Sequence, residues 1–227
     1  MILKLHQRNK VKGFSFRMLL AFCLCSFLSF GQSNGLSEKD STNTRATRYY
    51  QISRFLKLSP QDKIADIGSG NGTSILRLAE DCPDCFFTVE DIDSNTCAKD
   101  VYIKKLRNSK VDISHFTFYI GNEKSTTLPE KNFNKVLMFD VIHELLYKTE
   151  MLNDIKRILQ PNGSLYIEEI LVNRKVKKDK GCSFPFLKEE ELKHILEENG
   201  WSIKREEYTY KSSQNRYIKI FECSYLP

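Results

Sequence analysis

Long hydrophobic runs are scarce in this sequence, and acidic residues are missing from its first part. Residues 1–31 contain no Asp or Glu, although the whole chain of 227 residues has 29 of them. The hydrophobic run Met18–Phe30 spans 13 residues, whereas a membrane-spanning helix needs about 20. With 41% hydrophobic and 28% charged residues, the composition excludes a wholly disordered chain, a collagen-like fibre and a polytopic membrane protein.

The missing acids concentrate the net charge at the start of the chain. The formal net charge is +6, from 35 Lys and Arg against 29 Asp and Glu, and residues 1–31 hold five of the bases and none of the acids. The remaining chain therefore has a net charge of only +1. A globally basic surface for nucleic acid is not indicated, and no nucleic-acid partner is predicted.

The first residues have the pattern of a secretory signal peptide. A basic stretch leads into Met18–Phe30, small residues flank Phe30, and a polar stretch follows. We predict a signal peptide or N-terminal anchor at residues 1–31 and a linker at 32–44. The domain that follows is then periplasmic or secreted, or membrane-anchored through the N-terminal segment alone if the leader is not cleaved. A buried N-terminal helix and translation from Met18 are the alternatives.

The rest of the chain alternates short hydrophobic strands with amphipathic helices. The predicted strands are Lys63–Ile67, Phe86–Glu90, Phe116–Ile120, Lys135–Phe139, Ser164–Ile170, Trp201–Tyr210 and Tyr217–Tyr225. The predicted helices are Arg45–Leu58, Thr73–Glu80, Asn95–Arg107, Met151–Leu159 and Lys188–Glu198. This alternation favours one α/β domain over residues 45–227, with a parallel sheet, helices on both faces and a final antiparallel pair.

A glycine-rich loop follows the first predicted strand. Gly68, Gly70 and Gly72 come at every second position, so the backbone can turn sharply and a ligand can approach without Cβ clashes. Asp66 precedes them, whereas dinucleotide-binding loops have the spacing GxGxxG and need no acid there. An acid beside the loop would repel a pyrophosphate and attract a cationic group. Asp91 ends the next strand, where a carboxylate can accept hydrogen bonds from a ribose.

With these motifs the sequence resembles the class I S-adenosylmethionine-dependent methyltransferases, from about Arg45 to the C-terminus. The resemblance implies a Rossmann-like, doubly wound, mostly parallel seven-stranded sheet with an antiparallel last strand, and S-adenosylmethionine as cofactor. It also implies that the methionine part and part of the ribose lie against the glycine loop. The cofactor-binding residues that it implies are Asp66, Gly68, Ser69, Gly70, Asn71, Gly72, Asp91, Ile92, Asn122, Glu123 and Asp140.

Two of these positions have roles that the sequence alone does not decide. Asp91 fits the ribose-binding acid best, with Ile92 beneath the adenine, but Glu90 or Asp93 takes that role if the register differs by one residue. Asn122 stands where the family has Asp, and an amide oxygen can still accept the hydrogen bond of the adenine amino group.

The segment after the fourth strand holds the candidate catalytic residue. Asp140-Val141-Ile142-His143 replaces the family's Asn/Asp-Pro-Pro-Tyr motif, which is typical of DNA-base and some protein amide methylation. A small-molecule acceptor is therefore favoured over a protein. His143 is the candidate catalytic base for a hydroxyl or thiol, and the alternative is a residue at the rim of the pocket or in solvent. The basic cluster Arg174–Lys180 is either a site for an anionic substrate or a solvated loop.

The cysteines do not indicate a metal site, and none is predicted. Cys82 and Cys85 form a CxxC in the turn before the second strand, which fits a local disulfide or plain turn cysteines. A zinc site would need a second pair of ligands at suitable spacing, which this sequence pattern does not provide.

Methyl transfer is the function that the sequence favours, but the leader raises an alternative. The cofactor is made in the cytosol, whereas the leader predicts export. A non-catalytic exported binding module that keeps the fold is therefore the second hypothesis. A nicotinamide oxidoreductase is disfavoured by Asp66 and by the glycine spacing.

Overall fold

The fold is described from a computed structural model, which defines residues 38–107, 109–174, 182–211 and 215–225. The predicted leader, residues 1–31, lies outside the described residues. Among the described helices, none is both long enough and apolar enough to cross a membrane.

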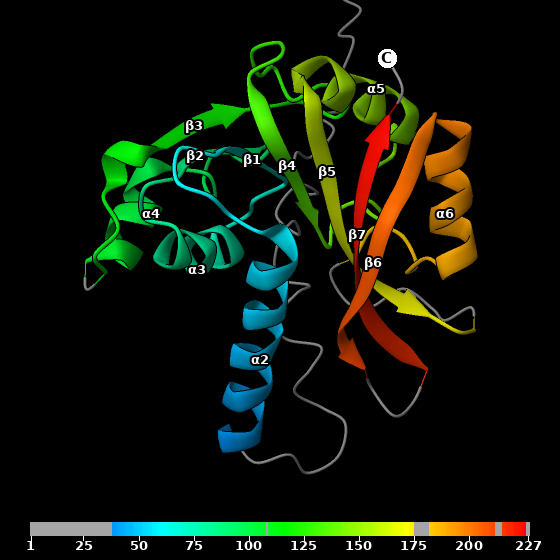
Figure 1. Cartoon of the computed structure of the whole chain (residues 1–227), viewed down its shortest axis with the longest axis horizontal. Helices are drawn as coiled ribbons and strands as arrows, with labels where there is room; N and C mark the ends of the chain where they lie inside the picture. Colours follow the sequence, from blue (N-terminus) through cyan, green and yellow to red (C-terminus); the bar gives the residue numbers. More distant parts are fainter. Residues whose placement is uncertain (1–37, 108, 175–181, 212–214, 226–227) are drawn as a thin grey trace, which may run out of the picture.

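A seven-stranded sheet forms the centre of the molecule, with the strand order β3-β2-β1-β4-β5-β7-β6 (Figure 1). Its strands are β1 Lys63–Ile67, β2 Phe86–Asp91, β3 Phe116–Ile120, β4 Phe133–Phe139, β5 Leu159–Val172, β6 Trp201–Lys211 and β7 Arg216–Tyr225. Five neighbouring strands from β3 to β5 are parallel, and β7 is antiparallel to both β5 and β6. This confirms the predicted doubly wound sheet with an antiparallel last strand.

Helices cover both faces of the sheet (Figure 1). They are α2 Glu38–Leu56, α3 Thr73–Asp81, α4 Lys99–Leu106, α5 Lys148–Ile158 and α6 Glu189–Glu198, with a short 3-10 turn at Ile113–His115. One hydrophobic core joins α2, α3 and α4 to the sheet, and a second core joins α5 and α6 to the opposite face. In β1, the neighbours Ile64 and Ala65 are both fully buried and belong to different cores, because successive strand residues point to opposite faces.

Several helices begin at other residues than the sequence predicts. Helix α5 starts at Lys148 rather than Met151, and α6 starts at Glu189 rather than Lys188. Helix α4 starts at Lys99 rather than Asn95, because the oxygens of Asp93 hold the preceding turn. The Asp93 carboxylate accepts hydrogen bonds from the backbone and side-chain nitrogens of Asn95, at 2.9 and 3.0 Å. Such local bonds compete with helix formation. Helix α2 starts at Glu38, within the range predicted as a linker.

The fifth strand also starts earlier than predicted. Leu159 pairs with Phe133, and the next pair is Ser164 with Lys135, so the register shifts between them. The predicted turn at Pro161-Asn162-Gly163 is this irregularity inside β5, and regular pairing resumes at the predicted Ser164.

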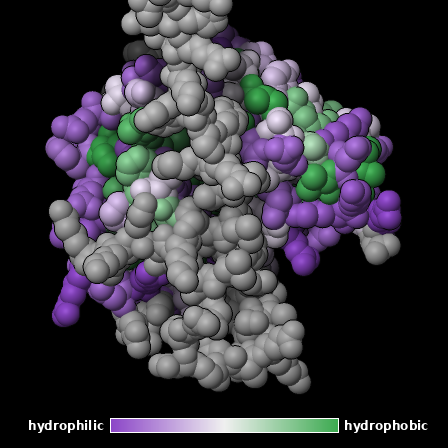
Figure 2. Space-filling model, turned by 180° about the vertical axis from the view of Figure 1, so that it is seen from behind, coloured by the Kyte–Doolittle hydropathy of each residue, from purple (hydrophilic) through white to green (hydrophobic). Residues whose placement is uncertain are grey.

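The turn between α3 and β2 contains a disulfide between Cys82 and Cys85, one of the two readings of the CxxC. The other described cysteines, Cys97, Cys182 and Cys223, are in no disulfide. Seen from behind, the visible described surface is mostly hydrophilic, with small hydrophobic patches (Figure 2).

Candidate functional site

A cavity of about 340 Å³ opens at the carboxyl ends of the parallel strands. The loops after β1, β2 and β4 line it, together with one turn of α2 and the segment between β5 and α6. Strand β1 lies between β2 and β4, which is where the chain switches from one side of the sheet to the other. Such a switch point is the usual binding site of an open α/β sheet.

The glycine loop after β1 forms one wall of the cavity. Gly68 has φ 67°, and a Cβ there would lie 2.7 Å from a Val141 methyl, so only glycine fits. Gly72 has φ 73°, and a Cβ there would lie 2.3 Å from the Tyr102 ring. The Tyr102 hydroxyl donates to Ser69 Oγ at 3.2 Å, so the ring supports the loop from behind.

Nine of the twelve predicted site residues line the cavity, and three lie behind its wall. The lining residues are Gly68, Ser69, Asn71, Asp91, Ile92, Asn122, Glu123, Asp140 and His143. Asp66, Gly70 and Gly72 do not line it: the two glycines shape the loop, and Asp66 is a buried residue of β1.

Three buried acids stand beside the loop. Asp91 accepts hydrogen bonds from the backbone nitrogens of Gly70, at 2.7 Å, and Asp93, at 2.9 Å. Glu90 also lines the cavity, and its Oε1 is buried with no hydrogen-bond partner. Burial, and then the charge of Asp91, raises the pKa of Asp66 to about 8 and that of Glu90 to about 8. The register alternative Glu90 thus has an unpartnered oxygen, which lies against Gly121.

The predicted adenine-binding segment follows β3. Asn122 Oδ1 accepts hydrogen bonds from the backbone nitrogens of Lys124 and Ser125, both at 3.0 Å. The Asn122 side chain therefore holds its own turn at the cavity wall. Ile92 lines the same region and is 40% exposed.

An ion-pair network that the sequence did not reveal closes the opposite side of the cavity. Arg48 of α2 donates to Glu168 of β5, from Nε at 2.9 Å and from Nη2 at 2.5 Å. Arg48 Nη2 also lies 3.4 Å from Asp140 Oδ2, and the Ile170 backbone donates to Asp140 Oδ1 at 3.2 Å. Asp140 has φ 57°, an uncommon conformation that clusters at functional sites. Burial raises its pKa to about 7, although Arg48 opposes this rise.

His143 lies in the cavity wall, in the turn between β4 and α5, and is only 2% exposed. Its Nδ1 lies 2.6 Å from Glu169 Oε1, and its Nε2 lies 3.3 Å from Glu144 Oε1. Burial lowers its pKa, but the charges and hydrogen bonds of Glu169 and Glu144 outweigh burial and raise it to about 10. These contacts favour the charged form of His143, and its side chain is buried in the wall rather than exposed to solvent.

One sequence signal indicates that partners are needed here, although it does not identify them. Glu168 and Glu169 are adjacent acids within a predicted buried strand, and both are fully buried. Since successive strand residues point to opposite faces, both faces of β5 needed a cation or a donor. Arg48 meets this need on one side and His143 on the other. The basic cluster Arg174–Lys180 falls outside the described residues except for Arg174.

Comparison with known proteins identifies relatives of the chain. The model of the Methyltransferase domain family matches residues 58–200. No curated protein matches the sequence.

Three solved structures illustrate the likeness. A SAM-dependent methyltransferase from Aquifex aeolicus is 17% identical, with a TM-score of 0.61 over 77% of this chain and 88% of that chain. The [4+2]-cyclase SpnF is 15% identical, with a TM-score of 0.66 over 85% of each chain. Phosphoethanolamine N-methyltransferase 2 from Haemonchus contortus, in complex with S-adenosyl-L-methionine, is 16% identical, with a TM-score of 0.62 over 78% of this chain and 52% of that chain. At such identities the likeness is one of fold.

Proposed function

The chain belongs to the Methyltransferase domain family, and from that premise we propose that it transfers a methyl group from S-adenosylmethionine to a small-molecule acceptor. The observation that carries the proposal is the cavity wall formed by the glycine loop and the buried acids. When bound, the cofactor supplies a methyl group that its sulfonium makes electrophilic.

The residues of this wall suit that cofactor. Its ribose hydroxyls are hydrogen-bond donors and its ammonium group is a cation, whereas Asp66, Glu90 and Asp91 are acids whose pKa values burial raises. Burial disfavours the ionised form of a carboxyl group, and a hydrogen-bond donor or a positive charge beside the group stabilises that form. The unpartnered Glu90 Oε1 is the oxygen with most to gain.

Each part of the cavity then has a role. The Gly68–Gly72 loop holds the methionine part and part of the ribose, and Glu90 and Asp91 hold the ribose hydroxyls. Ile92 and Asn122 face the adenine. The chain's main task is to align an acceptor with the methyl group, for which orientation alone can supply several kcal/mol. His143, which lines the same cavity, is the residue placed to contact the acceptor.

Calorimetric titration of the full-length chain with S-adenosylmethionine tests the proposal. We expect binding at one site, an affinity loss of more than tenfold for Asp91→Ala, and unchanged binding for the exposed control Glu80→Ala. NAD should give no heat. The absence of binding at millimolar cofactor would contradict the proposal.

A second measurement separates catalysis from binding alone. SpnF, a cyclase, shares this fold, so the fold also carries other chemistry. Formation of S-adenosylhomocysteine from a panel of small thiols and alcohols would support methyl transfer. Cofactor binding without turnover of any candidate acceptor favours the exported binding module.

Export is part of the proposal and rests on the sequence alone. The basic flank and the hydrophobic run Met18–Phe30 support it. Mass spectrometry of the mature protein should find an N-terminus at Gln32, and an intact Met1 in the cytosolic fraction would oppose export.

A further inference from the structure

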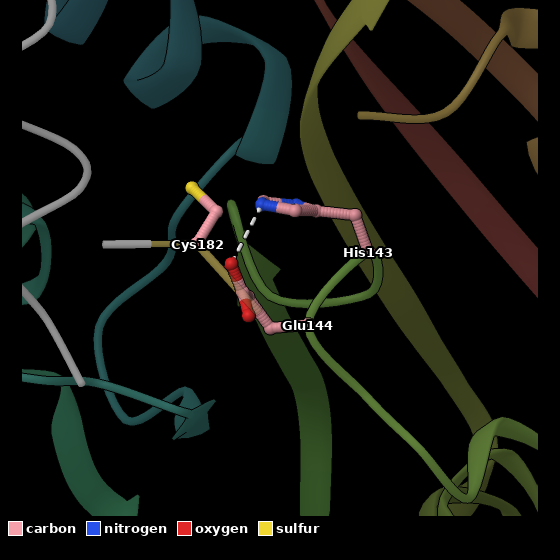
Figure 3. Close-up of side chains that lie close together, drawn as sticks. All are labelled: His143, Glu144 and Cys182. Atoms are coloured by element: carbon pink, nitrogen blue, oxygen red, sulfur yellow. Dashed lines mark ion pairs between the residues drawn. The ribbon is translucent and has the colours of Figure 1, made fainter. Parts of the chain in front are cut away.

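Three side chains of types that can ligate a metal converge beside the cavity: those of His143, Glu144 and Cys182 (Figure 3). One ligand atom from each lies within 4.8 Å of the others. His143 and Glu144 come from the turn after β4, and Cys182 comes from the segment between β5 and α6. The fold therefore brings together residues that are 38 positions apart in the sequence.

Two of the facing atoms in this cluster, His143 Nε2 and Glu144 Oε1, are poorly satisfied. Both atoms are buried, and no hydrogen bond of good geometry satisfies either of them, although they lie 3.3 Å apart as an ion pair. A buried polar atom without a partner costs free energy, and each such atom calls for an explanation. A bound ion would satisfy both atoms at once.

Neighbouring groups orient the donors toward a common point. A carboxylate can only accept, so His143 Nδ1 donates its hydrogen to Glu169 Oε1, at 2.6 Å, and Nε2 faces the cluster. The Ser183 backbone donates to Glu144 Oε2 at 2.9 Å and leaves Oε1 toward His143. A carboxylate that holds the far nitrogen of a histidine is the usual support behind metal-ligating histidines.

We propose that His143, Glu144 and Cys182 bind a divalent transition-metal ion, for which Zn²⁺ is the best match. An imidazole nitrogen, a carboxylate oxygen and a thiolate sulfur are all zinc ligands, and a mixed set of this kind excludes Mg²⁺ and Ca²⁺, which take oxygen ligands. Bonds of about 2.0–2.3 Å would draw the three donors closer together.

Three protein ligands leave one tetrahedral position open, as in catalytic rather than structural zinc sites. Because His143 and Glu144 line the cavity, this position opens on it. If the proposed function holds, the ion binds the thiol or hydroxyl group of the acceptor and lowers the pKa of that group. The group then loses its proton to solvent. Ion binding itself does not depend on methyl transfer.

Cobalt titration of the full-length, chelator-treated chain tests the site without any cofactor. We expect one equivalent of Co²⁺ to give the intense visible bands of tetrahedral cobalt together with a thiolate-to-cobalt charge-transfer band, and Zn²⁺ to displace it. Cys182→Ser should remove the charge-transfer band, and His143→Ala should weaken binding by at least a hundredfold. Glu169→Gln, which alters only the support of His143, should weaken it by 10- to 100-fold.

Matched variants keep the result specific. His194→Ala removes an exposed histidine of α6 and should bind cobalt like the unchanged chain. A variant with serine at all four closely spaced cysteines should do the same; these are Cys23, Cys25, Cys82 and Cys85. Far-UV circular dichroism verifies folding, and if His143→Ala does not fold, Cys182→Ser decides. An octahedral spectrum, or a charge-transfer band that survives Cys182→Ser, overturns the proposal.

The failure of this proposal can be told from failure of the proposed function. Asp91→Ala should lose cofactor affinity and keep the cobalt spectrum, whereas Cys182→Ser should lose the charge-transfer band and keep cofactor binding. A chain that binds S-adenosylmethionine but gives no tetrahedral cobalt spectrum refutes the metal site alone.

Discussion

The two sides of the cavity are built in different ways. The loop half consists of Asp66–Gly72 and Glu90–Ile92, and the strand-end half consists of Arg48, Asp140–Glu144, Glu168, Glu169 and Cys182. In the loop half, positive-φ glycines set the shape, and among the described residues no ion pair involves its three acids. In the strand-end half, Arg48 and His143 pair with carboxylates.

This difference suggests that the loop half serves ligand binding and that the strand-end half also stabilises the fold. The buried acids of the loop half have no cation beside them, so their ionised form is disfavoured. A ligand that brings hydrogen-bond donors or positive charge stabilises that form. Charges in the strand-end half already satisfy one another, so they also support the fold. Substitutions in the strand-end half should therefore affect stability first, and those in the loop half should affect ligand binding.

The largest effect is expected from Glu168→Ala in the strand-end half. Glu168 is fully buried and accepts hydrogen bonds from Arg48 and from Thr209 Oγ1. Removing Glu168 leaves the charge of Arg48 without its partner, which should cost about 3–5 kcal/mol of unfolding free energy. Urea unfolding measures it. Glu80→Ala, which breaks only the exposed pair with Arg77, should change stability by less than about 0.5 kcal/mol. Equal losses of unfolding free energy in the two variants would contradict the stabilising role of the strand-end half.

A smaller loss of stability is expected from Gly72→Ala in the loop half. A left-handed backbone costs a residue with a Cβ about 1–3 kcal/mol, and this Cβ would meet the Tyr102 ring at 2.3 Å. The loop should shift, so cofactor affinity should fall together with stability. Gly200→Ala tests the backbone strain alone, because at φ 71° its Cβ would meet only the Lys156 ammonium, at 3.4 Å. If Gly200→Ala weakens cofactor binding as much, the loop-specific explanation is wrong.

The loop half could be read from the sequence because its residues are neighbours along the chain. Asp66, Gly68, Gly70 and Gly72 form one continuous motif, and Asp91 follows at the end of the next strand. Their spacing carries the geometry directly, as do the alternating patterns that predicted all seven strands.

The strand-end half could not be read in this way. Arg48 and Glu168 are 120 residues apart, and the sequence contains no signal that pairs them before the sheet order is known. The same holds for Cys182 and His143, so no metal site was predicted. Local hydrogen bonds by Asp93 likewise decided where α4 begins. Side-chain contacts over long separations are a product of the fold.

The pH dependence of stability sharpens the comparison further. Burial raises the pKa of Glu90 to about 8, so the folded state holds a proton there that the unfolded state releases near pH 4. The resulting stability is present at low pH and is lost as the pH rises through about 8. Glu90→Gln, which mimics the protonated form, should therefore gain stability relative to the unchanged chain between pH 6 and 8, by about 2 kcal/mol.

The comparison between the Glu90→Gln variant and the unchanged chain isolates the contribution of Glu90. Asp66, with a pKa of about 8, and Asp140, with a pKa of about 7, contribute slopes of the same sign in both chains, and these slopes cancel in the difference. Urea unfolding at several pH values in the absence of cofactor gives the two curves. Parallel curves would show that Glu90 is ionised in the folded protein and that its oxygens have partners in solution.

The smallest effect is expected from Asn122→Asp, which restores the acid typical of the family. The side-chain oxygen of Asn122 accepts two backbone hydrogen bonds that hold its turn, and an aspartate would accept the same two. The shape of the wall should persist, so the affinity for S-adenosylmethionine should change by less than about threefold, or 0.7 kcal/mol. Calorimetry beside Asp91→Ala compares Asn122 with an acid of the loop half. A gain of tenfold or more would mean that the adenine amino group needs a charged acceptor, and that binding in the loop half depends on charge at its rim as well as on backbone shape.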